Sequence, residues 1–270
     1  MKQVRPKKNL GQHFLVDLNI AKQIADTVDE PFPTLPILEV GPGMGVMTQF
    51  LEKKPRPLKV VEIDRESVAY LTQYSALDAQ QIISADFLRM DLHEVFSGLP
   101  FVLTGNYPYD ISSQIFFHVL DNKDIIPCCT GMIQHEVAMR MAAQPGTKQY
   151  GILSVLIQAW YDVEYLFTVG PSVFNPPPKV QSAVIRMTRN QVTNLGCDWP
   201  LFRRVVKTTF NQRRKMLRVS LRQLLPNLSS LATPLTSSPM MTQRPEQLTI
   251  QQFVDLTNLV SDELQTRQGL

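Results

Sequence analysis

The sequence is poor in cysteine. Its 270 residues contain three cysteines, and two of them, Cys128 and Cys129, are adjacent. Cysteines at this spacing provide neither a disulfide framework nor a zinc-binding pattern, so we expect no structural metal. Because nothing in the chain requires an oxidising compartment, we expect the protein to work in the reducing cytoplasm.

Long apolar runs are also missing. No stretch of 18 uncharged apolar residues occurs in the chain, which argues against a transmembrane helix. The first residues, MKQVRPKKNLGQHFL, are basic but lack the apolar segment of a signal peptide. We therefore expect neither secretion nor membrane insertion. With 44% hydrophobic and 19% charged residues, the composition is that of a globular protein.

Acidic residues are scarce in one long part of the chain. Between Tyr165 and Pro245 the only acid is Asp198, whereas twelve lysines and arginines lie there. The modest net charge of +3 therefore hides a strong asymmetry. Such a basic region favours a polyanionic partner, because binding to phosphates releases counterions. Solvated helix faces without a partner would give the same composition.

Short apolar runs alternate with segments of helical periodicity up to about Thr188. The expected strands are Ile37–Val40, Leu58–Ile63, Gln81–Ser84, Phe101–Thr104, Pro127–Ile133, Tyr161–Val169 and Ser182–Thr188. The expected helices are one beginning at Asp17 and others near 45–54, 65–75, 112–121, 135–142 and 150–159. This alternation predicts an α/β fold with a mostly parallel sheet and helices on both faces. The last two strands, joined by a proline-rich connection, are expected to pair antiparallel at one edge.

The C-terminal part of the chain shows no strand pattern. Helical periodicity runs over 201–224, a polar segment covers 226–243, and a last helix is expected at Pro245–Leu259. We therefore divide the chain into an α/β domain, residues 1–190, and a small all-α domain, residues 191–270, which carries the densest positive charge.

The first expected strand of the sheet leads into GPGMG, with glycines at 41, 43 and 45. Glycines between a strand and a helix allow a tight turn and a close approach of a ligand, although a tight turn alone would look the same. Position 46 is valine, so the G-x-G-x-x-G pattern of dinucleotide sites is absent, and no P-loop lysine follows. The remaining G-x-G-x-G pattern favours S-adenosyl-L-methionine, which has no pyrophosphate.

Two acids support this interpretation. Glu62 ends the second strand, where a carboxylate can accept hydrogen bonds from both ribose hydroxyls. Asp86 follows the third strand and is placed to accept from the adenine amine. Each would alone be an ordinary residue at a strand end. With Gly41 and Gly43, however, they meet at the edge where open α/β sheets bind ligands.

The fourth strand leads into GNYPYD, residues 105–110. A proline-containing β-turn needs no function, but methylation of an exocyclic adenine amine would use this segment. The amine is a poor nucleophile, and two acceptors for its N–H groups favour attack by its lone pair. The side chain of Asn106 and the backbone carbonyl of Tyr107 provide such acceptors, and Pro108 fixes the turn. Tyr109 offers a stacking face to an unstacked base.

These motifs are part of a similarity to a known protein family that covers nearly the whole chain. The matching blocks are KKNLGQHFL, ILEVGPGMG, VVEID, SADF, GNYPYDIS, QHEVAMR, YGILSV, VFNPPPKVQSAV, FNQRRKMLR and RPEQLT. In this order they resemble the bacterial small-subunit ribosomal RNA adenine dimethyltransferase family. The resemblance implies a Rossmann-like class I methyltransferase sheet that uses S-adenosyl-L-methionine, with a helical rRNA-binding domain. It also implies dimethylation of two adjacent adenines near the 3′ end of 16S rRNA in a small-subunit precursor.

The resemblance assigns roles to individual residues. The implied cofactor contacts are His13 and Leu15 of a cofactor lid, with Gly41, Glu62, Asp86 and Asn106. Phe174 takes the position of an aromatic ring that supports the target base opposite Tyr109. The residues expected to hold rRNA phosphates are Arg213, Arg214, Lys215, Arg218 and Arg222.

The sequence departs from the family pattern at Tyr107, where an aliphatic residue is usual, and at Asp110, where asparagine is common. Two alternative functions remain open: a large-subunit rRNA adenine methyltransferase of the macrolide-resistance type, and a ribosome-assembly factor that binds RNA without catalysis. FNQRRKMLR and RPEQLT favour the small-subunit enzyme, and the intact Asn106-x-Pro-Tyr favours catalysis. Because no dimerisation pattern is visible, we expect a monomer.

Overall fold

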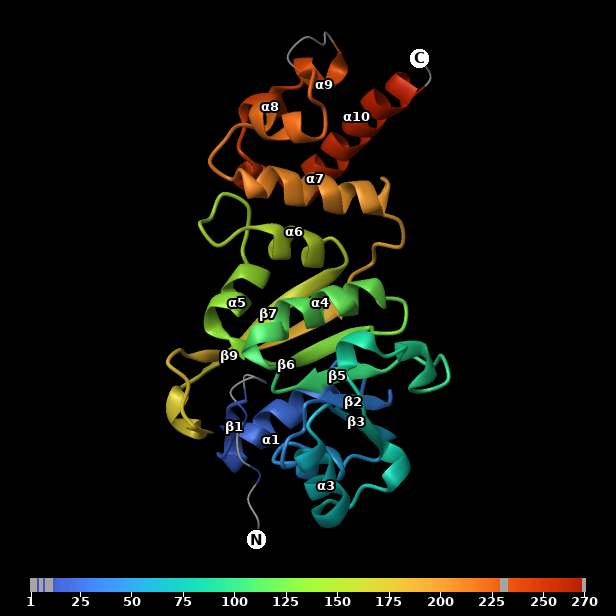
Figure 1. Ribbon diagram of the computed structural model, residues 1–270, viewed down its shortest axis with the longest axis vertical. Coiled ribbons are helices and arrows are strands. Elements are labelled where there is room, and N and C mark those ends of the chain that lie inside the picture. Colours follow the sequence, from blue (N-terminus) through green and yellow to red (C-terminus); the bar gives the residue numbers. More distant parts are fainter. Residues whose placement is uncertain (1–3, 5–6, 8–11, 229–232, 269–270) are drawn as a thin grey trace. The chain divides into compact units, whose positions relative to one another are not determined.

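The computed structural model describes the chain except for residues 1–3, 5–6, 8–11, 229–232 and 269–270. Its course is shown in Figure 1. The chain forms two compact units, the first from Met1–Met139 with Tyr161–Arg189 and the second from Arg140–Trp160 with Asn190–Leu270. One boundary between the two units therefore follows Arg189, next to the expected boundary after residue 190. In addition, the segment Arg140–Trp160 belongs to the second unit. The sequence pattern had placed that segment in the α/β domain.

The first unit is built on a mixed sheet with the strand order β4-β3-β2-β5-β6-β9-β7. Its strands are β2 (Ile37–Val40), β3 (Leu58–Glu62), β4 (Ile82–Ser84), β5 (Val102–Gly105), β6 (Cys128–Gln134), β7 (Tyr161–Val169) and β9 (Ser182–Arg189). Strands β2 to β6 pair in parallel, and β9 is antiparallel to both β6 and β7. The predicted α/β sheet and its antiparallel edge pair are confirmed, with every strand bound within one residue of the expected one.

Five helices of the described residues belong wholly or mainly to this unit, and two of them begin at an aspartate cap. The five are α1 (Leu18–Asp26), α2 (Thr48–Leu51), α3 (Arg65–Tyr74), α4 (Ser112–Asp121) and α5 (His135–Met141), and the capped ones are α1 and α3. Asp17 caps α1 by accepting from the backbone N–H groups of Asn19 and Ile20. Helix α2 is shorter than the expected 45–54, because Gly45 has φ +75° and therefore lies outside the helical region.

Apolar residues cover both faces of the sheet. On one face Ile24 of α1 belongs to a buried cluster with Val60, Val102 and Met132. The central strands β2 and β5 are buried throughout, as expected for parallel strands enclosed on two sides. Burial of this kind fixes the strand ends, and therefore the loops that follow them, in space.

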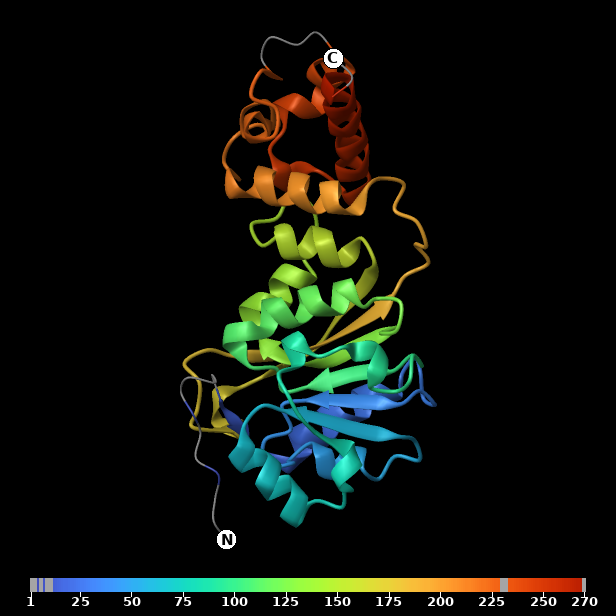
Figure 2. The same cartoon turned by 45° about the vertical axis from the view of Figure 1, so that its right-hand side comes forward.

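A two-stranded ribbon accompanies the sheet. Strand β1 (Phe14–Leu15) pairs antiparallel with β8 (Phe174–Asn175), and the pairing brings Phe14 opposite Asn175. The sequence pattern did not predict this ribbon. The pairing joins the beginning of the described chain to a segment that lies about 160 positions later, and Figure 2 shows the same unit from a second side.

The second unit is helical in its described residues, as the sequence predicted for the C-terminal part. Its helices are α6 (Ile152–Gln158), α7 (Trp199–Asn211), α8 (Leu217–Ser220), α9 (Pro234–Ser237) and α10 (Ile250–Gln268). Phe253 of α10 stacks on Phe210 of α7, with ring centroids 5.8 Å apart. Segment 140–160 belongs here because the Tyr150 hydroxyl donates to the carbonyl of Leu248 at 2.9 Å.

The last helix differs from the expected Pro245–Leu259 at both ends. Pro245–Gln247 forms a 3-10 turn, and α10 starts only at Ile250. Thr249 and Gln252 exchange side-chain and backbone hydrogen bonds, which is the pattern of a capping box. None of the helices in the described part of the chain has the length and apolarity that crossing a membrane requires.

Candidate active site

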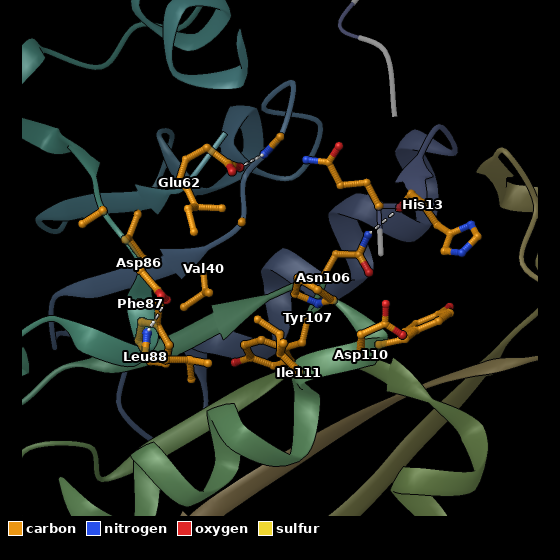
Figure 3. Close-up of a pocket in the computed structure, with 18 of the residues that line it drawn as sticks. His13, Val40, Glu62, Asp86, Phe87, Leu88, Asn106, Tyr107, Asp110 and Ile111 are labelled. Carbon is orange, nitrogen blue, oxygen red and sulfur yellow. Dashed lines mark hydrogen bonds between the residues drawn. The ribbon is translucent and has the colours of Figure 1, made fainter. Parts of the chain in front are cut away.

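A pocket of about 230 Å³ opens at the carboxyl ends of β2, β3 and β5. Figure 3 shows Glu62 and Asp86 at one end of it, and Asn106, His13 and Asp110 at the other. Glu62 is the last residue of β3, the other three acceptors follow β4 or β5, and His13 belongs to the N-terminal segment. The sheet therefore brings together residues that lie far apart in the sequence.

The glycine loop forms one wall of the pocket. Gly41, Gly43 and Gly45 all have positive φ, between 56° and 75°, which is the region that glycine adopts without strain. The backbone N–H of Gly41 donates to the carbonyl of Val61 in β3. The sheet pairing thus continues up to Gly41, and the loop turns away directly after it. Gly43 is in contact with the ribbon, because a Cβ built there would lie 3.0 Å from Cε1 of Phe14.

Glu62 is held at the end of β3 by two backbone hydrogen bonds. Its Oε2 accepts from the N–H of Gly43 at 3.1 Å, and its Oε1 accepts from the N–H of Asp64 at 2.9 Å. The side chain is 4% exposed, and burial raises its pKa. A carboxylate oriented in this way keeps further lone pairs for the hydroxyl groups of a ligand.

Asp64 ties the N-terminal segment to this loop. It is buried and caps α3, and its Oδ1 is 2.5 Å from Nζ of Lys7. Although burial acts in the opposite direction, the hydrogen bond from Lys7 holds the pKa of Asp64 below its usual value. The lysine thus anchors the segment that carries His13.

Asp86 follows β4 and caps the 3-10 turn η4 (Phe87–Arg89). Its Oδ1 accepts from the backbone N–H of Leu88 at 3.0 Å, and its Oδ2 is 3.4 Å from Nε of Arg89. Ile63 and Leu88 line the pocket beside it, and Ile63 is 52% exposed. An exposed apolar side chain here suits the flat face of a heterocycle.

The Asn106 amide is oriented by the N-terminal segment. Its Nδ2 donates to the backbone carbonyl of His13 at 3.1 Å, which leaves Oδ1 as an acceptor at the pocket. Asn106 follows β5 directly and forms an isolated parallel bridge with Met132. Its backbone is therefore fixed by the sheet, and its side chain by the ribbon.

The Tyr107 side chain is structural. It is 1% exposed, and its hydroxyl donates to the carbonyl of Thr130 at 2.9 Å. Its ring occupies space that two glycines leave open, since a Cβ on Gly131 would lie 2.7 Å from the ring and one on Gly105 would lie 3.1 Å from it. Only the backbone of Tyr107 is left for a role at the pocket, and this explains how the unusual tyrosine is accommodated.

Tyr109 is held at the pocket by its neighbours. Its hydroxyl is 2.5 Å from Oγ of Ser182. Its ring stacks with that of His13, with centroids 5.5 Å apart and an interplanar angle of 30°. The His13 ring in turn donates from Nδ1 to the carbonyl of Pro176 at 2.9 Å. Pro108 lines the pocket between these groups, so the aromatic face is positioned from three segments of the chain.

Two residues assigned by resemblance lie away from the pocket surface. Leu15 and Phe174 are each 4% exposed and belong to the buried core cluster, where β1 pairs with β8. Neither lines the pocket. The structure thus places Phe174 in the core, and its expected stacking on the target base has no support from the pocket geometry. Leu15 contributes through the ribbon that holds His13.

The basic block lies in the second unit, between α7 and η8 (Leu221–Gln223). The exposed members are Arg214, Lys215, Arg218 and Arg222. Arg213 differs, because its Nε is 2.5 Å from a carboxylate oxygen of Glu246 and its guanidinium donates to the carbonyl of Thr147 at 3.0 Å. Arg213 therefore connects segments within the unit, and the four exposed members remain candidates for phosphate contacts.

Sequence reasoning missed several residues of the pocket. They are Gln12, Phe14, Val40, Val61, Ile63, Ala85, Phe87, Leu88 and Ile111. Most are apolar neighbours of the predicted residues, and apart from Ile63 nothing in their sequence context distinguishes them from core positions. The position of Ile63 between Glu62 and Asp64 was the one available signal, because an apolar residue between two acids after a strand faces the ligand edge.

The pocket suits S-adenosyl-L-methionine. The glycine loop forms one wall, a buried carboxylate can accept from the two hydroxyls of a ribose, and apolar side chains can contact a purine. Among the described residues, no lysine or arginine lines the pocket to bind a phosphate. The fold and this donor set define a class I methyltransferase that uses S-adenosyl-L-methionine. The family model described as ribosomal RNA adenine dimethylase matches residues 3–262. The chain belongs to the ribosomal RNA adenine dimethylase family.

Similar proteins agree with this assignment. The chain is 66% identical to a ribosomal RNA small subunit methyltransferase A of Bacteroides thetaiotaomicron, over 98% of each chain. It is 49% identical to the protein of the same name from Flavobacterium johnsoniae, over 96% of this chain and 97% of that one.

Solved structures show the same fold. A dimethyladenosine transferase from Plasmodium falciparum superposes with a TM-score of 0.75 at 22% identity, over 90% of this chain and 96% of that one. The 23S rRNA methyltransferase ErmE superposes with a TM-score of 0.63 at 26% identity, over 90% of this chain and 99% of that one. The predicted class I methyltransferase fold is confirmed.

Proposed function

We propose that this protein dimethylates the exocyclic amines of two adjacent adenines in the 3′-terminal hairpin loop of 16S rRNA. The substrate is the RNA of a small-subunit precursor in the cytoplasm, and the enzyme acts as a monomer. The observation that carries the proposal is the Asn106 amide, whose N–H group is bound by His13 and whose oxygen is left to accept from an amine. Relatives named small subunit methyltransferase A, at 49–66% identity, support the choice of RNA.

The residues of the pocket perform the reaction by alignment. S-adenosyl-L-methionine, when bound, supplies a methyl group activated by a sulfonium. Oδ1 of Asn106 and the carbonyl of Tyr107 hold the two N–H groups of the adenine amine and direct its lone pair into the pocket. The Tyr109 ring supports the base, while Glu62 and Asp86 hold the ribose and adenine of the cofactor. The amine nitrogen gains the methyl group and loses a proton to solvent.

The exposed basic residues provide the affinity for RNA. Arg214, Lys215, Arg218 and Arg222 extend from one short segment of the second unit, and no described acid pairs with them. Phosphate contacts of this kind position an RNA without reading its sequence. The target adenine is then selected by its ability to leave its loop and enter the pocket.

The proposal is tested with two RNA substrates and methyl-labelled cofactor. Small subunits isolated without methylation at these adenines are one substrate, and naked large-subunit rRNA is the other. We expect label in the small-subunit RNA, with two methyl groups on each of two adjacent adenines after nuclease digestion. Label confined to one adenine of the large-subunit RNA would establish the alternative substrate, and binding without label would establish a non-catalytic role.

A further inference from the structure

Asp110 is a pocket residue for which the proposed reaction has no use. Three carboxylates line the pocket, those of Glu62, Asp86 and Asp110, and no lysine or arginine of the described chain lines it. The proposed reaction assigns Glu62 and Asp86 to the ribose and the adenine. Asp110 remains, at the end of the pocket that holds Asn106 (Figure 3).

The three carboxylates differ in how far neighbouring groups compensate their negative charge. Glu62 accepts two backbone hydrogen bonds in a buried position, and burial disfavours its charged form. Asp86 has Arg89 within 3.4 Å. Asp110 is exposed, and within the described part of the chain it has neither an ion pair nor a side-chain hydrogen bond. It therefore contributes an uncompensated negative charge to the reacting end of the pocket.

A ligand group that this carboxylate attracts electrostatically carries a positive charge. An RNA phosphate would be repelled by it, and no basic side chain of the described residues reaches it. The methyl donor carries a sulfonium, which gives the molecule a net charge of about +1, whereas its demethylated product is a neutral thioether with no net charge. The two molecules differ in the charge of one sulfur atom and in the methyl group.

We propose that Asp110 makes the pocket select the positively charged methyl donor over its neutral product. The inference rests on the proposed function and deepens it. When the methyl group leaves, the attraction between Asp110 and the ligand is lost, so the product dissociates and a new donor molecule binds. Dimethylation of two adenines consumes four donor molecules, with an exchange between successive transfers, so this selectivity limits inhibition by accumulated product.

The test uses Asp110→Asn, which keeps the size of the side chain and removes its charge. Calorimetry on the intact protein measures the Kd values of S-adenosyl-L-methionine, of S-adenosyl-L-homocysteine and of sinefungin, an unreactive analogue with an amine in place of the sulfonium. We expect the two cationic ligands to bind about three- to ten-fold more weakly and the neutral product to bind unchanged, as for a partly solvated charge pair. The loss should diminish in 0.5 M salt, because ions screen an exposed carboxylate.

Asp162→Asn is the matched control, because Asp162 is exposed on β7 and does not line the pocket. Its three Kd values should equal those of the wild type. An equal loss for all three ligands in Asp110→Asn would mean a packing role and overturn the inference, as would no loss at all. Wild-type protein that binds the cofactor without methylating either RNA would refute the proposed function, yet the ratio of the Kd values would still decide the role of Asp110.

Discussion

At the scale of single residues, the site depends on side chains whose orientation is set by distant backbone. Asn106 illustrates this, because its amide nitrogen is bound to the carbonyl of His13, a residue 93 positions earlier in the sequence. The motif predicted that Asn106 would be an acceptor. It could not predict which backbone group would orient the amide, since that depends on the pairing of β1 with β8.

Asn106→Ala should remove the hydrogen-bond acceptor without unfolding the protein. We expect the methylation rate to fall by about 100-fold or more, which is typical of losing one preorganised hydrogen-bonding group. Single-turnover kinetics and cofactor calorimetry on the same samples check this. Tyr109→Phe, which keeps the aromatic face, should lose far less activity than Asn106→Ala. Comparable losses in the two variants would contradict the assigned roles.

Glu39 is a buried acid behind the glycine loop, 1% exposed, whose Oε2 accepts from the hydroxyl of Thr48 at 2.7 Å. Burial raises its pKa to about 8. The folded protein thus holds a proton that the unfolded chain releases above its ordinary pKa of 4.5. The stability that this proton provides is complete below that value and is lost as the pH rises towards 8.

Glu39→Gln should remove this pH dependence. We expect the free energy of unfolding of the wild type, relative to the variant, to fall by about 1.4 kcal/mol per pH unit between pH 5.5 and 7.5. Urea unfolding at three pH values measures it. Glu94→Gln, at an exposed position, should follow the wild type. If the free energy of unfolding of Glu39→Gln changes with pH in the same way as that of the wild type, Glu39 is ionised in the folded protein.

At the scale of elements, the central strands of the sheet could be predicted because buried parallel strands leave continuous apolar runs in the sequence. The ribbon of β1 and β8 could not. Each of its strands has two residues, too few for any periodicity, and the partners come from opposite ends of the first unit. The ribbon nevertheless supplies Phe14 to the pocket and holds the neighbouring His13, so a residue that the sequence pattern missed comes from an element that it missed.

Gly43→Ala tests how the ribbon and the glycine loop fit together. The new Cβ would lie 3.0 Å from the Phe14 ring on a backbone with φ +56°. Gly98→Ala is the matched control, since Gly98 has φ +80° and open space around it. Both variants should lose about 1–2 kcal/mol of stability from backbone strain. Only Gly43→Ala should also weaken cofactor binding, which calorimetry measures. Normal binding by this variant would show that the Phe14 ring moves aside without affecting the pocket.

At the scale of the whole molecule, charge and connectivity are distributed unevenly between the two units. The basic region was evident from composition. The membership of Arg140–Trp160 in the helical unit was not, because a helical pattern in a sequence does not indicate which neighbour a helix packs against. The Tyr150 hydroxyl bond to Leu248 is a tertiary contact without a local signal.

Replacing Arg214, Lys215 and Arg218 together by glutamine should weaken RNA binding and reduce the salt dependence of the binding constant. The slope of log K against log salt should decrease by about two to three, because each removed charge leaves one RNA phosphate with its counterions. A variant with Arg214→Lys, Lys215→Arg and Arg218→Lys keeps all three charges and should retain the slope. Filter binding over a range of salt concentrations distinguishes them, and equal slopes would remove this cluster from the interface.

The pairing of β1 with β8 has a consequence for synthesis of the protein. The hydrogen bond between His13 and Pro176 joins residues separated by 163 positions. A chain emerging from the ribosome presents its N-terminal segment first, and this segment has no strand to join until about two-thirds of the protein has been made. Incomplete chains and fragments that end before β8 should therefore fail to retain the cofactor. Methyl-donor binding is thus reserved for molecules whose synthesis has passed β8.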